Sequence, residues 1–339
     1  MTVSVLPRVR PPCGQARSGV ALVTRGAGQH DRGMSPTDAT GPVEPAPLPA
    51  PVSVPVEGGE LRAFRYGGET APRRTVLAVH GITASSRAWP AVAAALPEDW
   101  SLVAPDLRGR GASRDLEGPA GLRKHADDVC RLAEHLDGSG ELVLAGHSMG
   151  AYVAVLAARA RPDLFGRVVL VDGGVPLPVP EGTDPDALLE ATLGPALARL
   201  SQTYASVEDY VAFFRQHPAL GPHWSSTVED YVRYDAMETD GGVRSRAVED
   251  AVRTDGRDLL VSGTDLDAGL RGLGVPTRLL AAPLGMFGQA PGLLPAQAVA
   301  AYDAEVEVLQ AETVPEVNHY TILFDPAAAV RVAGAITGS

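Results

Sequence analysis

From residue 51 to the end of the chain, short apolar runs alternate with amphipathic or alanine-rich stretches. The runs have the length of buried strands, and the stretches between them have the apolar spacing of helices. The runs span residues 52–56, 61–66, 75–79, 102–104, 141–145, 168–171, 277–281 and 306–309. Strands that alternate with helices favour a mostly parallel sheet. The pattern therefore predicts an α/β fold with an eight-stranded sheet flanked by helices.

The first two runs flank Glu57-Gly58-Gly59, which predicts a hairpin. We expect helices over residues 89–96, 122–136, 151–161 and 326–336. The last of these helices follows the eighth strand and closes the fold. The hairpin makes the first part of the sheet antiparallel and leaves the remainder parallel.

The alternation breaks between residues 173 and 273, where aromatic and acidic residues occupy helical-looking segments. This predicts a helical cap inserted after the sixth strand, over a core made of residues 51–172 and 274–339. We expect most of its aromatic side chains to form the cap's own core, and one or two to line an apolar pocket over the site. These residues are Tyr204, Tyr210, Phe213, Phe214, Trp224, Tyr231 and Tyr234.

Residues 1–50 are rich in proline, glycine and arginine and show no hydrophobic period, which predicts an extended or disordered tail. Its end, residues 45–51, has a proline at every second position, so that stretch lacks donors for a helix or a sheet. Residues 1–33 carry five arginines against one aspartate. We hypothesise that they come from a start site placed too far upstream, which sequencing the native N-terminus would test.

Composition narrows the class of protein. The 339 residues are 45% hydrophobic and carry a net charge of −12, with Lys124 as the single lysine, which argues against a nucleic-acid partner. Cys13 and Cys130 are the only cysteines, so a structural disulfide is not expected. There is no apolar run of about 18 residues and no signal-peptide pattern, so we expect a cytoplasmic protein without a membrane partner. Oligomeric state is not indicated.

Gly146-His147-Ser148-Met149-Gly150 lies between a buried run and an alanine-rich helical stretch. This strand, tight turn and helix has the form of a nucleophile elbow, which lifts a serine hydroxyl towards a base. Glycines flank the serine because the turn brings strand and helix too close for side chains. A G-x-S-x-G match alone is weak evidence for a nucleophile. Its position between a predicted strand and a predicted helix makes it stronger evidence.

Three further motifs support the elbow: His80-Gly81-Ile82-Thr83, then Asp106-Leu107-Arg108-Gly109-Arg110-Gly111, and Val317-Asn318-His319-Tyr320-Thr321. In this order the motifs resemble the α/β-hydrolase superfamily over roughly residues 51–339. The resemblance implies that Ser148 is the nucleophile and that the backbone N–H groups of Ile82 and Met149 form an oxyanion hole. Asp106 and Arg108 are interpreted as structural.

The resemblance also implies His319 as the base, because the family order is serine, acid, histidine. The other seven histidines belong to the tail, to the motifs, or to positions expected to be ordinary: His30, His80, His147, His125, His135, His217 and His223. The acid departs from the family pattern, since residues 279–297 contain no Asp or Glu and Gly288 occupies the usual place.

Asp172, in the loop after the sixth strand, is the chosen acid, because some members of the family use that position. The alternative interpretation of Asp172 is a structural carboxylate that caps a turn, with Asp303 and Glu305 as the next candidates. Gly81 and Trp89 are candidates for the substrate pocket, and helix anchoring is the alternative for Trp89.

The resemblance therefore implies a serine hydrolase of small molecules that uses an acyl-enzyme, most simply a carboxylesterase, with no metal and no organic cofactor. Alternatives remain open: hydrolysis of a lactone, thioester or carbon–carbon bond, a lyase or cofactor-free oxygenase, or a binding protein with an inactive triad. Serine at the elbow argues against dehalogenase and epoxide hydrolase chemistry.

Overall fold

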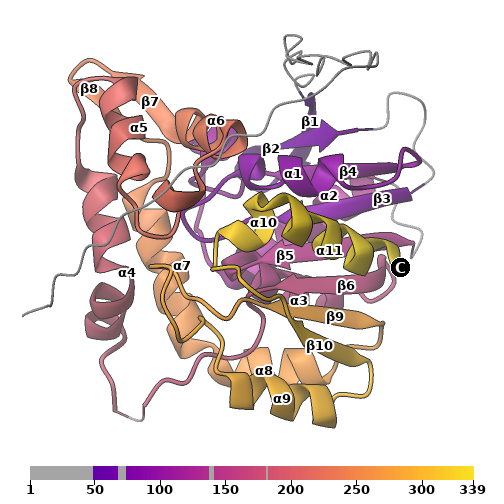
Figure 1. Ribbon diagram of the computed structural model, residues 1–339. Coiled ribbons are helices and arrows are strands. Elements are labelled where there is room, and N and C mark those ends of the chain that lie inside the picture. Colours follow the sequence, from indigo (N-terminus) through magenta and orange to yellow (C-terminus); the bar gives the residue numbers. More distant parts are fainter. Residues whose placement is uncertain (1–48, 68–73, 137–140, 181) are drawn as a thin grey trace, which may run out of the picture. The chain divides into compact units, whose positions relative to one another are not determined.

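The structure is a computed structural model, and it describes residues 49–67, 74–136, 141–180 and 182–339. The apolar runs form one sheet in the order β1-β2-β4-β3-β5-β6-β9-β10 (Figure 1). Its strands are β1 Ala50–Val56, β2 Gly59–Tyr66, β3 Arg74–Val79, β4 Trp100–Pro105, β5 Leu142–His147, β6 Phe165–Val171, β9 Thr277–Ala281 and β10 Leu309–Thr313. The β1–β2 and β2–β4 pairs are antiparallel and the other pairs are parallel. The predicted mostly parallel α/β sheet is confirmed.

Helices cover both faces of the sheet. The central strands carry apolar side chains on both faces, and each face must be buried. Two separate apolar clusters result, one on each face. One face carries α2 Leu122–His135, α3 Met149–Ala160, α8 Gly263–Arg271 and α9 Ala296–Glu305. The other carries α1 Pro90–Ala94, α10 Thr321–Phe324 and α11 Pro326–Thr337 (Figure 1).

The predicted last strand, residues 306–309, begins three residues too early, since β10 starts at Leu309. Val306 instead ends α9, where its N–H donates to the Tyr302 carbonyl at 2.9 Å, and its side chain is buried. The apolar pattern at this point therefore marks burial of a turn and not strand pairing. An apolar run of only four residues does not distinguish a buried turn from a short strand.

The segment between β6 and β9 contains α4 Pro185–Ser201, α5 Val207–Arg215, α6 Ser226–Asp235 and α7 Glu249–Val261. It also contains an antiparallel hairpin, β7 Ala236–Thr239 and β8 Gly242–Ser245, which the helical prediction lacked. Short 3₁₀ turns occur at Ser86–Ala88, Gly111–Ser113 and Gly221–His223. We call residues 185–261 the cap, which lies beside the sheet on the left of Figure 1.

Helix α8 differs from the rest of the inserted segment. The sequence placed it in the cap, but Leu266 and Leu270 belong to the apolar cluster under the sheet, and α8 packs against α3. Gly269 lies so close to α3 that an added Cβ would meet Val155 Cγ1 at 3.0 Å. The chain therefore returns to the sheet layer before residue 274.

The turn after β4 is structural, as predicted for Asp106 and Arg108. The Asp106 carboxylate accepts hydrogen bonds from the Ser86 and Ala112 backbone N–H groups at 2.7 and 2.8 Å. The Arg108 guanidinium binds Asp128 and two backbone carbonyls. These buried polar groups satisfy one another and fix the loop at the edge of the sheet.

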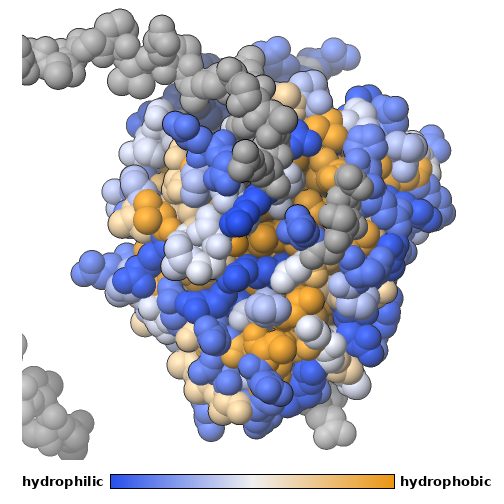
Figure 2. All heavy atoms as spheres, turned by 90° about the vertical axis from the view of Figure 1, so that its right-hand side faces the viewer, coloured by the Kyte–Doolittle hydropathy of each residue, from blue (hydrophilic) through white to orange (hydrophobic). Residues whose placement is uncertain are grey.

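The side of the molecule away from the cap mixes hydrophobic patches with hydrophilic residues (Figure 2). Among the described residues, no helix combines the length and the apolar character needed to cross a membrane. Residues 1–48 of the predicted tail, with Cys13 and the hypothesised start-site segment, lie outside the described residues. The expectation that residues 45–51 cannot join a sheet is wrong for Ala50 and Pro51, which begin β1 and pair with Arg65 and Phe64.

Candidate active site

Ser148 occupies the sharp turn between β5 and α3, with φ 53° and ψ −124°. This left-handed conformation is rare for a residue with a side chain, and strained backbone of this kind is characteristic of a nucleophile elbow. An added Cβ at Gly146 would lie 2.1 Å from the Gly150 carbonyl oxygen, and one at Gly150 would lie 2.2 Å from that of Val79. Only glycine fits at either place.

The structure brings together the three side chains that the sequence selected. The Ser148 Oγ lies 3.0 Å from His319 Nε2, and His319 Nδ1 lies 2.6 Å from Asp172 Oδ2. Ser148 follows β5, Asp172 follows β6, and His319 lies in the loop after β10. Because the carboxyl ends of parallel strands meet at one edge, three segments far apart in sequence converge there.

Asp172 reaches His319 from an unusual backbone position, with φ 44°. Its N–H donates to the Leu280 carbonyl at 2.7 Å, and its second carboxylate oxygen accepts from the Ala282 N–H at 3.0 Å. The segment after β9, which lacks an acid of its own, thus supplies a backbone donor to Asp172. These two bonds hold the carboxylate in a buried position against the imidazole.

The alternative acids lie elsewhere. Asp303, on α9, accepts the Ala311 N–H at 2.6 Å, and Glu305 pairs with Arg271 at 2.8 Å on the surface. Gly288 is turned towards the cap, since an added Cβ would lie 3.3 Å from Ala219 Cα. Of the carboxylates that the sequence offered, Asp172 is the one bonded to His319.

The loop after β3 lies against the nucleophile. An added Cβ at Gly81 would lie 3.1 Å from the Ser148 Cβ and 3.5 Å from its Oγ, so a side chain there would crowd the serine. Met149 is the first residue of α3, where backbone N–H groups have no partner within the helix. Neither the Ile82 nor the Met149 N–H donates to another described residue, which leaves both available to an oxyanion.

Two buried histidines flank this arrangement and stay uncharged. Burial lowers the pKa of His80 to about 3, and its Nδ1 bonds to the Gly81 carbonyl while its Nε2 accepts the Leu107 N–H. Burial also holds the pKa of His147 well below its ordinary value, and its Nε2 lies 2.7 Å from the His319 carbonyl. Each ring therefore positions backbone beside the site, a role that the sequence did not indicate.

A cavity of about 110 Å³ lies between the cap and the edge of the sheet. Its walls are mainly apolar, with Leu193 from α4 and Phe213, Phe214 and Tyr231 from α5 and α6. Thr83 of the loop after β3 and Tyr320, which follows His319 in the sequence, also line it, whereas Ser148 and His319 do not. Three of the cap's aromatic residues line it, one more than expected, and so does His217, which was expected to be ordinary.

Trp89 does not line this cavity. Its side chain is 0% exposed and packs in the apolar cluster between the sheet and α11, at the start of α1. The expectation that Trp89 faces the substrate is therefore corrected in favour of the alternative, anchoring of the helix.

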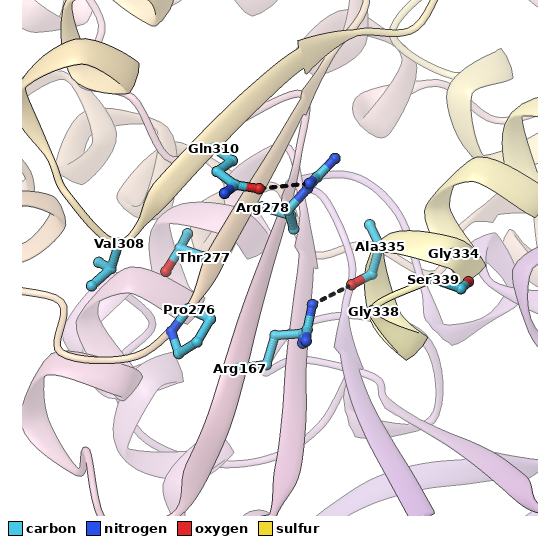
Figure 3. A pocket seen from close by; sticks show the side chains of 10 residues that line it. All are labelled: Arg167, Pro276, Thr277, Arg278, Val308, Gln310, Gly334, Ala335, Gly338 and Ser339. Carbon is cyan, nitrogen blue, oxygen red and sulfur yellow. Dashed lines mark hydrogen bonds between the residues drawn. The ribbon is translucent and has the colours of Figure 1, made fainter.

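A larger cavity of about 380 Å³ lies at the opposite ends of the parallel strands (Figure 3). Arg278 of β9 donates to Gln310 of the adjacent strand β10 at 2.8 Å, and Arg167 reaches the Ala335 carbonyl at 3.4 Å. Ser148, Asp172 and His319 line neither this cavity nor the smaller one, but the smaller one is lined by Tyr320, which adjoins His319. Size alone therefore does not locate the chemistry.

The profile of the Alpha/beta hydrolase family matches residues 76–333, which contain Ser148, Asp172 and His319. The chain belongs to this family. The hydrolase is 29% identical over 249 residues to 2-(acetamidomethylene)succinate hydrolase of Mesorhizobium japonicum, which covers 72% of this chain and 81% of the relative. It is 38% identical over 118 residues to lipase LipV of Mycobacterium tuberculosis, a match to 35% of this chain and only 43% of that lipase.

Solved structures show the same fold. The crystal structure of E-2-(acetamidomethylene)succinate hydrolase superposes with a TM-score of 0.68 and 24% identity, over 86% of this hydrolase and all (100%) of that chain. A thioesterase domain from the curacin biosynthetic pathway superposes with a TM-score of 0.69 and 22% identity, with the same shares covered (86% and 100%). At these identities the likeness concerns the fold.

A buried ion pair that the sequence did not indicate supports the loop after β3 in this hydrolase. The Arg110 Nε donates to the Ile82 carbonyl at 3.0 Å, and its Nη1 pairs with Asp255 of α7 at 2.5 Å. His125 of α2 also bonds to Asp255, at 3.0 Å. The cap helix α7 is thereby tied to the peptide next to Ser148. Arg110 stood in a quoted motif, but nothing in the sequence paired it with a residue 145 positions away.

Asn318 joins the histidine loop to the cap in a similar way. Its side-chain amide donates to the Ala219 carbonyl at 2.9 Å, and its Oδ1 accepts from the Tyr320 and Thr321 N–H groups. The residue before His319 therefore sets the conformation of that loop. Its place beside the candidate base was the only signal available from the sequence.

Proposed function

We propose that this alpha/beta hydrolase cleaves a carboxylic ester or a related acyl substrate through an acyl-enzyme on Ser148. The observation behind the proposal is the unbroken sequence of contacts from Ser148 Oγ to His319 Nε2, at 3.0 Å, and from His319 Nδ1 to Asp172, at 2.6 Å. A serine hydroxyl beside an imidazole whose other nitrogen is held by a carboxylate is suited to nucleophilic acyl transfer.

In the first half of the reaction His319 Nε2 takes the Ser148 proton as Oγ bonds to the carbonyl carbon. The carbonyl electron pair moves onto oxygen, where the Ile82 and Met149 N–H groups stabilise the negative charge. When the carbonyl re-forms, the alcohol leaves with the proton from His319. Asp172 keeps Nδ1 protonated and stabilises the imidazolium.

In the second half a water molecule takes the place of the alcohol. His319 removes its proton as the oxygen attacks the acyl carbon, and the proton then returns to Ser148 Oγ as the acid leaves. The overall reaction converts ester and water into acid and alcohol. No residue outside the arrangement described above is required for proton transfer.

Labelling with a fluorophosphonate probe tests the activated serine. We expect the wild type to be labelled and Ser148→Ala to be unlabelled, with Ser201→Ala, an exposed serine at the end of α4, as the labelled control. A series of p-nitrophenyl esters should favour short acyl chains, because the cavity measures about 110 Å³. A wild type that is folded and resists the probe contradicts the proposal.

Cleavage of an acyl C–N bond is a second candidate, favoured by one relative. The Mesorhizobium japonicum protein is named for 2-(acetamidomethylene)succinate, which contains an amide, and the match covers 72% of this chain. The same acyl-enzyme chemistry serves both bonds. Matched ester and amide substrates with identical acyl groups decide between them by their ratio of kcat/KM.

A further inference from the structure

The cavity wall contains one guanidinium among apolar side chains. Arg199 of α4 lines the cavity and is 6% exposed. Its Nη1 donates to the Tyr210 hydroxyl at 2.5 Å and to Asp235 Oδ2 at 2.9 Å, and the Phe214 ring lies 5.1 Å from its central carbon. A cation in a mainly apolar wall is costly unless something compensates its lost hydration.

The carboxylate that pairs with Arg199 faces away from the cavity. Asp235 is absent from the cavity wall, and both of its oxygens accept from the Ser245 hydroxyl, at 3.0 and 2.8 Å. Tyr210 donates to Asp235 as well. The Asp235 carboxylate therefore has its hydrogen-bond partners outside the cavity. Arg199 is the charged residue of the pair that borders the cavity.

Arg199 also has donors to spare. A guanidinium carries five N–H groups, and the two contacts above both use Nη1. Its Nε and Nη2 groups have no acceptor among the described side chains and backbone. Since Arg199 lines the cavity, these donors are available to a bound molecule.

The charge on Arg199 acts on residues that lead to the candidate base. Burial lowers the pKa of His217, and the positive charge of Arg199 lowers it further. The His217 ring lies 5.4 Å from the Tyr320 ring, which lies 5.3 Å from that of His319. Arg199, His217 and Tyr320 therefore line the same cavity, and the ring of His319 lies against that of Tyr320.

We propose that the substrate of this hydrolase is a short ester carrying a carboxylate, which Arg199 binds in the cavity while the ester carbonyl lies at Ser148. The inference deepens the proposed function and depends on it. Guanidinium and carboxylate match in geometry and charge. A volume of about 110 Å³ is smaller than the cavity of about 150 Å³ that holds benzene in a protein interior, so the bound part of the ligand is small.

Two pairs of esters test this inference. Monoethyl succinate is compared with ethyl 4-methylpentanoate, whose terminal branch has the shape of the carboxylate without its charge. The acetyl ester of 3-hydroxypropanoate is compared with isopentyl acetate, which places the charge on the alcohol side. We expect the wild type to prefer the charged member of at least one pair by about 10- to 100-fold in kcat/KM, the value of a hydrogen bond to a charged group.

The preference should disappear in Arg199→Met/Asp235→Asn, where the ratio should fall to within about threefold of one. The double change removes both charges, because a lone buried carboxylate would destabilise the cap. Arg199→Lys should retain part of the preference. Arg215→Met is the matched control, since Arg215 pairs with Glu229 and stacks on Trp224 outside the cavity, and its preference should equal that of the wild type.

Binding provides a readout that does not need turnover. In Ser148→Ala, calorimetry should detect binding of monoethyl succinate that ethyl 4-methylpentanoate does not match, and the Arg199→Met/Asp235→Asn change should abolish it. Equal kcat/KM for charged and neutral esters, or binding of monoethyl succinate unaffected by the double change, overturns the inference and leaves the proposed function intact. Failure of the fluorophosphonate probe to label the wild type overturns the proposed function instead.

Discussion

The two sides of the site are built differently. On the sheet side, Ser148 and Asp172 directly follow strands in strained turns, and His319 lies in the loop after β10. Backbone hydrogen bonds help to hold Ser148 and Asp172 in place. On the cap side, the cavity wall is formed by side chains that project from α4, α5 and α6. The sheet side is therefore held mainly by backbone geometry, and the cap side mainly by the packing of side chains.

Two buried arginine–aspartate pairs show the same contrast. The side chains of Arg110 and Asp255 are both 0% exposed, and the arginine is directed at the Ile82 carbonyl. Those of Arg199 and Asp235 are 7% and 12% exposed, and the arginine borders the cavity. The two pairs therefore differ in their surroundings: the arginine of the enclosed pair contacts backbone, and the arginine of the partly open pair borders a cavity.

The largest expected effect on activity comes from a substitution on the sheet side. Asp172→Asn should lower kcat by about 10⁴-fold on charged and neutral esters alike, because His319 then populates the wrong tautomer. Steady-state kinetics on both ester pairs measures this. Asp303→Asn, a surface carboxylate on α9, should leave kcat at the wild-type value. Full turnover by Asp172→Asn would assign the acid elsewhere.

The next effect compares the two ion pairs. Asp255→Asn should lower the free energy of unfolding by about 3–5 kcal/mol, because it leaves Arg110 charged and enclosed. Asp235→Asn should cost less, since Arg199 keeps Tyr210 and partial access to solvent. Urea denaturation at neutral pH measures both. An equal loss in the two variants would remove the distinction drawn between the pairs.

A third prediction concerns pH and the sheet side. His80 has a pKa of about 3 in the folded protein, lowered chiefly by burial, so the unfolded chain binds a proton more readily below about pH 6.5. Its contribution to stability is complete above that pH and is lost as the pH falls. From pH 6.5 to pH 5 the loss should be about 2 kcal/mol.

Denaturation curves of the wild type and His80→Gln at both pH values test this prediction. The variant should lose less stability on acidification, because glutamine does not titrate. His147 shifts in the same direction and is present in both proteins, so it does not affect the comparison. The same slope in both proteins would show that His80 is protonated in the fold.

The smallest expected effect is on substrate preference and comes from a substitution on the cap side. Leu193→Ala should enlarge the cavity and shift the preferred acyl chain towards longer esters by about 10-fold in kcat/KM, the value of one to two methylene groups. Fluorophosphonate labelling of Ser148 should continue in this variant. Val261→Ala, an exposed position at the end of α7, is the control with an unchanged chain-length profile.

The sheet side was largely predictable from the sequence. Ser148 and His319 lie in short local motifs, which can be recognised from a few neighbouring residues. Asp172 was harder, because the usual position after β9 lacks an acid. Its own position at the end of β6, followed by two glycines, indicated that it could turn towards the histidine.

The cap was predictable in outline only. The break in periodicity located the insertion, but the β7–β8 hairpin and the docking of α8 on α3 depend on tertiary contacts. The pairing of Arg110 with Asp255 likewise joins residues with no local relation in the sequence. Trp89 was expected at the substrate pocket because it lies close in sequence to the loop after β3. Its side chain is instead buried and does not line the cavity.

The sequence by itself determined the class of fold and the edge of the sheet where Ser148 lies, because periodicity and a glycine-flanked turn act over a few residues. Only the tertiary structure decided that Asp172 bonds to His319, that Arg110 holds the Ile82 peptide, and that Arg199 borders the cavity. Each of these contacts joins segments far apart in the chain. Their formation depends on how helices and strands pack, which no local pattern encodes.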